Sequence, residues 1–434
     1  MNIFGLCGLT LALGYAVFQY GGILVDDWRI SLLAVGCVSL IFWFRPRRRD
    51  ASPPLDALSR GLFAALFVLA VLQVIPLPLG ILKIISPARA ELLTAAEPLL
   101  GPVSMATLSV QPAASLEHIF RLAAYVLVFL MLRDLGWSFR SRPFWPVAPI
   151  LAIAWLEALL GIVQAHLGGV NAIASGTYPN RNHFAGLLAM TLPFTVAAAV
   201  AVYRNGKSKF ETPAAPAIAA CALLGAGATL LVGILFSLSR MGFLAALAGL
   251  VVSGAVAVSG GKPGWRTWVP LLTLLLISAL AFVFLPTDPL IVRFADLAAT
   301  DDISGDTRAQ VWGDTLRLIE AYPVFGSGLG SYESALMRFK SAAPMNAVDY
   351  AHNDYLQTAA EFGLPGLLVL LALGGVVIFR AVQAAGRQDN ARYIAIACIG
   401  AFAAIALHSL VDFNLYIPAN AMLLAWIAGL AASL

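Results

Sequence analysis

The sequence predicts an all-α integral membrane protein that crosses the bilayer about twelve times. Hydrophobic residues make up 60% of the 434 residues and charged residues only 12%, whereas a soluble domain carries roughly 25% charged residues. The mean hydropathy of +0.86 is too high for a water-soluble fold. The apolar residues also recur in long runs, as they do in membrane-spanning helices.

Each spanning helix needs roughly 20 mostly apolar residues. The first such run has no basic segment before it and no clear small-residue cleavage site after it, so we interpret it as a retained helix rather than a signal peptide. We expect one polytopic membrane domain over residues 1–434. The predicted spans are 3–19, 30–44, 61–79, 118–132, 144–166, 184–203, 214–236, 241–259, 267–285, 362–379, 393–411 and 415–432.

The basic residues of the short loops predict the orientation. Lys and Arg gather in cytoplasmic loops. In this chain every second loop between the predicted spans is rich in Lys and Arg, as expected if both termini are cytoplasmic. The opposite loops are poor in Lys and Arg and carry most of the acidic residues. The basic residues on the predicted cytoplasmic side are Arg45, Arg47, Arg48, Arg49, Arg60, Arg133, Arg140, Arg142, Arg204, Lys207, Lys209, Lys262, Arg266, Arg380, Arg387 and Arg392.

Two outer loops are long enough to carry structure of their own, residues 80–117 and residues 286–361. The first contains a predicted short helix from Ala88 to Glu97, directly after Pro87. The second contains a predicted helix from Arg308 to Tyr322 and a shorter one near 332–340.

The longer of these helices is expected to be amphipathic. Its predicted apolar face consists of Val311, Trp312, Leu316 and Ile319, with Arg308, Asp314 and Arg317 mostly off that face. Asp306 and Thr307 are expected to cap its N-terminus, and Pro323 to end it.

The strongest candidate for catalysis is His352 in AHNDYLQ, residues 351–357. A histidine with a pKa near neutrality accepts a proton from a hydroxyl nucleophile. Asn353 and Asp354 are candidates to hold its ring or to cap the next helix. The alternative is a solvated interfacial histidine followed by an Asp cap.

Three arginines on the predicted outer face suit an anionic ligand, because the guanidinium fork matches phosphate oxygens. Arg181 lies in TYPNRNHFAG, beside the spare candidate base His183. Arg240 lies in SLSRMG between two spans, and Arg308 lies in DTRAQVW. Alternatively, Arg181 is an arginine that reaches the membrane interface. Arg240 is then a plain turn residue, and Arg308 forms an ion pair with Asp306 or Asp314.

Other classes of site find no support in the sequence. The four cysteines lie in apolar runs without metal-ligand spacing. The glycine-rich segment GSGLGS follows a helix, so it does not have the strand–helix context of a dinucleotide site. We therefore expect no cofactor, no metal and no nucleic-acid partner.

The segments GTYPNRNHFAGLLAMTLP, LFSLSRMGFLAAL, RAQVWGDTLRLIEAYPVFGSGLGSY and AHNDYLQTAAEFGLPG, in this order and spacing, resemble the O-antigen ligase and O-antigen polymerase superfamily. The resemblance is strongest from about residue 150 to about residue 380. It implies an inner-membrane glycosyltransferase with a GT-C-like helical fold and a periplasmic site. It also implies a glycan donor linked to undecaprenyl pyrophosphate.

The resemblance also implies roles for individual residues. His352 matches the family's large-loop histidine and would deprotonate the acceptor hydroxyl, which attacks the anomeric carbon with inversion. Arg181 and Arg240 match the family's arginines and would neutralise the pyrophosphate leaving group. Arg308 matches a recurrent position. Asp412, in the family-like HSLVDFNLY, is a candidate to touch the acceptor or orient an arginine, or else caps a helix.

We expect the ligase type, with the lipid A core as acceptor, and keep an O-antigen or exopolysaccharide polymerase of the same superfamily as the alternative. A ligase passes the glycan to the lipid A core, whereas a polymerase passes it to another lipid-linked glycan. A different class is a lipid or polysaccharide transporter, which places ionisable groups near the bilayer midplane. Only Glu157 looks clearly intramembrane, so the concentration of polar residues on one face favours a transferase.

Overall fold

The computed structural model describes residues 2–44, 52–169, 172–205, 212, 214–260, 264, 305–341 and 347–434. These residues form a helical bundle with a small outer region, and the only strands among them are the antiparallel pair β1 (Leu77–Pro78) and β2 (Met105–Ala106). The long helices are α1 (Asn2–Phe18), α2 (Val25–Trp43), α3 (Ala57–Leu72), α6 (Pro112–Ser138), α7 (Ala148–Leu167), α8 (Arg181–Asn205), α9 (Ala215–Phe236), α10 (Arg240–Val258), α15 (Asp354–Ala385), α16 (Ala391–His408) and α17 (Pro418–Ala432).

Seven helices in the described part of the chain are long and apolar enough to cross a membrane: α6, α7, α8, α9, α10, α15 and α16. The helices α1, α3 and α17 are apolar but shorter. Eleven of the twelve predicted spans coincide with a described helix, and the twelfth, 267–285, lies outside the described residues. The chain is thus a multi-pass all-α membrane protein, and the number of twelve spans stays a prediction.

Helix α8 packs against α9, α10 and α16. Its side chains are buried nearly all round, as expected of an apolar helix inside a bundle. Small residues let the neighbouring helices approach closely. A Cβ on Gly249 of α10 would lie 2.9 Å from the Gly400 carbonyl oxygen of α16. Such close approach of two backbones at small residues is common between membrane helices.

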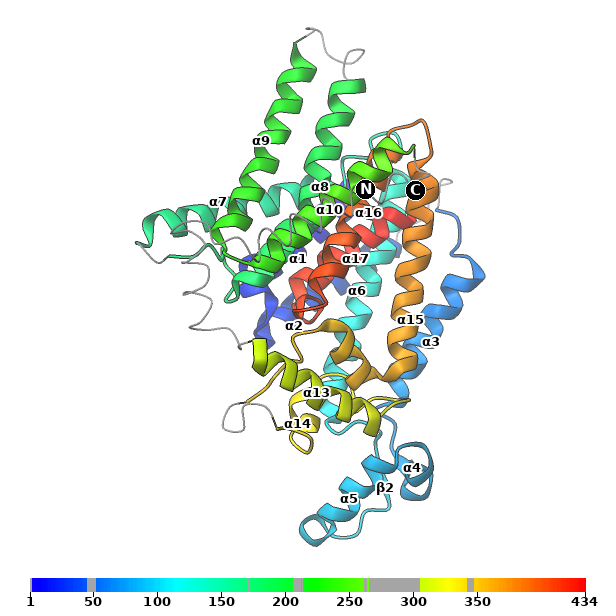
Figure 1. The fold of residues 1–434 in the computed structure, drawn as a ribbon. Coiled ribbons are helices and arrows are strands. Elements are labelled where there is room, and N and C mark those ends of the chain that lie inside the picture. The colour runs from blue at the N-terminus through cyan, green and yellow to red at the C-terminus, as the bar shows by residue number, and fades with distance from the viewer. Residues whose placement is uncertain are drawn as a thin grey trace.

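The outer region consists of short helices at one end of the bundle (Figure 1). These are α4 (Leu79–Ile85) and α5 (Pro87–Leu100) from the first long loop, and α13 (Gly305–Ala321) and α14 (Tyr332–Leu336) from the second. The predicted short helix after Pro87 is confirmed. The two termini lie near each other toward the opposite end in Figure 1, where Arg387 donates a hydrogen bond to the Leu434 carbonyl at 2.8 Å.

Two details predicted for α13 are wrong. The helix begins at Gly305 rather than at Arg308, so the backbone of Asp306 and Thr307 is part of it. The buried face includes Asp314, which is 1% exposed, while Leu316 is exposed. Asp314 accepts hydrogen bonds from the backbone N–H and hydroxyl of Ser341, at 2.7 and 2.6 Å. These bonds compensate the burial of the carboxylate.

A break at Gly363 in α15 docks the second long loop onto the bundle. Gly363 has φ +74°, and a Cβ there would collide with the backbone of Val324 and Gly326. The loop then pairs with the helix backbone through Leu364 N–H to the Pro323 carbonyl at 2.9 Å. The side chain of Gln73, at the end of α3, donates to the carbonyls of Phe325 and Glu361 at 2.6 and 2.8 Å.

Candidate active site

His352 lies in a short backbone segment that is fixed by hydrogen bonds from Trp312 and to Gln357. Its φ is +50°, a conformation that costs a non-glycine residue roughly 1 kcal/mol or more unless the surroundings impose it. Trp312 of α13 donates from its indole nitrogen to the carbonyl of Ala351 at 2.9 Å. The N–H of Ala351 donates to the side chain of Gln357 at 2.8 Å. The fold thus fixes the position from which the imidazole projects.

Asn353 and Asp354 have structural roles in this arrangement. The side-chain oxygen of Asn353 accepts from the N–H groups of Tyr355 and Leu356, both at 3.0 Å, and so caps α15. Asp354 is 1% exposed, and its carboxylate accepts from the Ser409 hydroxyl at 2.7 Å. The alternative of an Asp cap is wrong, because Asn353 caps α15 and Asp354 is its first residue. The predicted substrate contacts of both residues stay predictions.

The segment between α16 and α17 contacts His352 through Phe413. It includes a short 3-10 helix, η3 (Asn414–Tyr416). The ring of Phe413 stacks on Tyr350 with 4.0 Å between centroids. The rings of His352 and His183 contact Phe413 edge-on, at 5.0 and 4.6 Å between centroids. Phe413 thereby brings the candidate base His352 and the spare candidate His183 to one aromatic cluster.

Asp412 lies buried between two histidines. One carboxylate oxygen is 3.6 Å from His183 Nε2, and the other is 3.7 Å from His408 Nε2. Burial acts to raise the pKa of Asp412, but His183, His408 and the Phe413 N–H outweigh it and hold that pKa below its usual range. Asp412 does not cap α17, whose N-cap position is Ile417. Its position suits a residue that orients the histidines.

Two of the predicted arginines occupy the first residue of a helix. Arg181 begins α8 behind Asn180, whose side chain accepts from the N–H of Asn182 at 2.8 Å. Arg240 begins α10 behind Ser239, whose hydroxyl accepts from the N–H of Gly242 at 3.1 Å. The N-terminal ends of helices favour anions, because free N–H groups point outward there. Both positions therefore add a fixed positive charge where an anion is already favoured.

The two helix ends lie side by side, because a Cβ on Gly242 would collide with the Cβ of Ala185 in α8. The third arginine, Arg308, lies on α13 one turn before Trp312, the residue that holds the segment of His352. The link from α8 to His352 is the Phe413 ring, which contacts both His352 and His183, two residues after Arg181.

Glu157, the intramembrane acid considered for the transporter alternative, is buried and hydrogen-bonded. It is fully buried on α7, and its carboxylate accepts from the N–H and hydroxyl of Thr177 at 3.0 and 2.7 Å. These bonds brace the segment that leads into Arg181. Among the described residues, no group of three or more His, Cys, Asp or Glu is arranged to hold a metal ion.

Sequence reasoning missed a second set of polar residues near this site. His118 and Arg121 lie on α6, inside what was predicted as a span, and Glu361 lies on α15. Glu361 accepts hydrogen bonds from the Tyr416 hydroxyl at 2.8 Å and from the Tyr332 N–H at 3.1 Å. The signal that could have found Arg121 is an arginine within an apolar run, which is costly and is usually functional.

Comparison with known protein families gives one match. The O-antigen ligase family model matches residues 225–371, which include Arg240, Arg308 and His352. No curated protein matches the chain. This match over residues 225–371 supports the resemblance to the O-antigen ligase superfamily seen in the sequence motifs.

Proposed function

We propose that the protein is a glycosyltransferase of the ligase type, which moves a glycan from undecaprenyl pyrophosphate to a hydroxyl of the lipid A core. The observation that carries this proposal is the placement of His352. The histidine is held at φ +50°, and its ring contacts the same Phe413 ring as His183, which lies two residues after Arg181 at the start of α8. A proton acceptor next to an anion-binding surface is what this transfer requires.

In the proposed reaction, the imidazole of His352 takes the proton of the acceptor hydroxyl. The acceptor oxygen forms a bond to the anomeric carbon as the bond from that carbon to the pyrophosphate oxygen breaks, with inversion. The electron pair leaves with the pyrophosphate. Arg181 and Arg240 stabilise the charge that grows there, since a guanidinium stays protonated at every relevant pH. The proposal thus assigns charge neutralisation to arginines and needs no cofactor.

The remaining residues support this arrangement. Arg308 is proposed to contact the donor from α13, and Asn353 and Asp354 to hold the segment of the base. Asp412 is proposed to orient the histidines near the acceptor. We further propose a GT-C-like bundle of twelve spans in the bacterial inner membrane, with both termini cytoplasmic and the site periplasmic. The proximity of the termini and the placement of the outer helices at the other end support that orientation.

The test uses the purified full-length chain in nanodiscs with a glycan linked to undecaprenyl pyrophosphate. One tube contains lipid A core and the other does not. Glycan on the lipid A core would support the ligase proposal. Longer glycan on the carrier in the tube without lipid A would replace it with a polymerase of the same superfamily. Movement of the intact donor lipid across the bilayer, without transfer in either tube, would replace it with a transporter.

A further inference from the structure

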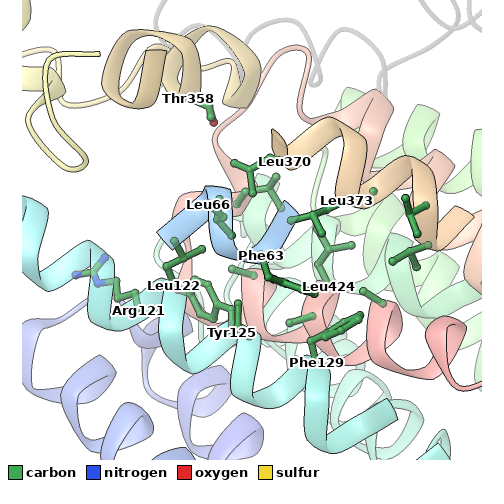
Figure 2. A pocket seen from close by; sticks show the side chains of 18 of the residues that line it. Phe63, Leu66, Arg121, Leu122, Tyr125, Phe129, Thr358, Leu370, Leu373 and Leu424 are labelled. Atoms are coloured by element: carbon green, nitrogen blue, oxygen red, sulfur yellow. The ribbon is translucent and has the colours of Figure 1, made fainter. Parts of the chain in front are cut away.

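A cluster of polar side chains lies inside the bundle, where α8 packs against α16 and the segment before α17. Its titratable members are His183, His408 and Asp412, which are 4%, 0% and 2% exposed. Burying an imidazole or a carboxylate among apolar helices costs free energy unless other polar groups compensate it. The cluster does not line the apolar groove of about 320 Å³ between α3, α6, α15 and α17, which is shown in Figure 2. Its side chains therefore act on one another rather than on a ligand in that groove.

The imidazole of His408 faces the carboxylate of Asp412. Its Nε2 lies 3.7 Å from Asp412 Oδ2, and neither ring nitrogen makes a hydrogen bond within the described part of the chain. The other carboxylate oxygen of Asp412 accepts from the Phe413 N–H at 2.9 Å and lies 3.6 Å from His183 Nε2. Asp412 thus turns one oxygen toward each histidine, and His408 faces the oxygen that makes no hydrogen bond.

Asp412 is the acid that faces these histidines in its charged form. Burial acts to raise the pKa of Asp412, but the two histidines and a backbone N–H hold it below its usual range, so the carboxylate is ionised at neutral pH. Asp354, a second buried acid nearby, takes its hydrogen bonds from the Ser409 hydroxyl at 2.7 Å and the Leu415 N–H at 3.2 Å. The interaction of a charge with its neighbours is stronger inside a protein than in water, so each histidine has a large effect on the orientation of Asp412.

Asp412 connects two sides of the candidate active site. Its backbone carbonyl accepts from the N–H of Asp354 at 3.1 Å, two residues after His352. Its side chain contacts His183 in the first turn of α8, the helix that begins at Arg181. The orientation of this one carboxylate therefore bears on the spacing between Arg181 and His352.

We propose that His408 is a positioning residue, which keeps the Asp412 carboxylate turned toward His183 and so fixes the first turn of α8 relative to the segment of His352. His408 touches no substrate and acts only through Asp412 and His183. Its effect on the reaction rests on the proposed function, in which Arg181 and His352 act in the same transfer step.

The first experiment compares His408→Leu with His408→Gln in the full-length chain in nanodiscs. Leucine fills a similar volume without a polar atom, whereas the glutamine amide donates a hydrogen bond to a carboxylate. We expect His408→Leu to lower kcat for glycan transfer roughly tenfold, the equivalent of about 1.4 kcal/mol, because a buried charged group loses a partner. Donor KM should change little, and His408→Gln should recover most of the loss. Equal losses in both variants would show that His408 only fills space, and they would overturn the proposal, as would wild-type kcat in His408→Leu.

A double-mutant cycle tests whether His408 acts through His183. Adding His408→Leu to His183→Leu should lower kcat no further than His183→Leu alone, because the same chain of contacts is already broken. Losses that multiply would show that His408 acts independently of His183, contrary to the proposal. Cys398→Ala alters another buried side chain of α16 and is the control, which should leave transfer unchanged.

Hydrogen exchange in the same nanodiscs separates this inference from the function on which it rests. In His408→Leu, backbone amides within residues 177–187 and 351–357 should exchange faster than in the wild type, and His408→Gln should restore their protection. Unchanged exchange in both segments would overturn the inference even if transfer fell. Absence of transfer in the wild type would contradict the transferase, and the exchange of the two variants would still decide the role of His408.

Discussion

Replacing Asn353 with alanine removes the hydrogen bonds that hold the segment of His352. The side-chain oxygen no longer accepts from Tyr355 and Leu356, and the side-chain nitrogen no longer donates to the Leu410 carbonyl at 2.8 Å. Loss of an N-cap costs about 1 kcal/mol, and the bond to Leu410 contributes about 1 kcal/mol more. His352 would then be free to leave its strained conformation at φ +50°.

A bias of roughly 2 kcal/mol toward relaxed conformations lowers the population of the competent state by up to about 30-fold. We therefore expect kcat for glycan transfer to fall by up to that factor in Asn353→Ala, with donor affinity little changed. Asn353→Ser retains a capping oxygen and should recover most of the loss. The assay is single-turnover transfer in nanodiscs. Wild-type kcat in Asn353→Ala would refute the view that this cap positions the base.

Three further predictions concern the arginines, the buried acid and the outer region. Arg240→Gln should lower kcat by roughly 10²- to 10³-fold with a small effect on KM. Arg240→Lys should lose less activity, because lysine keeps the positive charge but not the planar guanidinium. A change confined to KM would contradict this role. The lowered pKa of Asp412 stabilises the fold above its unfolded-state pKa of about 3.9. The melting temperature in detergent should therefore fall as pH drops below about 4, and Asp412→Asn should flatten that slope; equal slopes would contradict the pairing. Gln73→Leu removes hydrogen bonds to buried backbone groups of the second long loop and of α15. It should lower the unfolding free energy by about 3 kcal/mol. An unchanged melting temperature would show that these hydrogen bonds are dispensable.

The helices of the bundle could be predicted because their signal is local. Runs of apolar residues as long as a bilayer is thick leave a chain few alternatives to helix. The turn at Arg240 and the short helix after Pro87 were also visible, since a basic break between apolar runs and a proline at a helix start are local signals. The family-like order of motifs added a specific role for the candidate His352.

The details set by tertiary contacts could not be read from the sequence. Asp314 looked like a surface residue of α13, but Ser341 satisfies its carboxylate in a buried position. The break at Gly363 depends on the close approach of Gly326 and Val324, which lie far from it in sequence. Arg121 lay within an expected span, and only the packing of α2 and α6 shows that it lies over Trp28.

The most direct test of the central claim compares turnover and donor binding in His352→Ala. Binding of the undecaprenyl-pyrophosphate-linked donor is measured on nanodiscs, and glycan transfer is followed in the same preparation. His166→Ala, which alters an exposed histidine at the end of α7, is the matched control. If His352 is the proton acceptor, its removal abolishes transfer while donor binding and the control stay as in the wild type. Transfer at the wild-type rate in His352→Ala would contradict the assignment of the base.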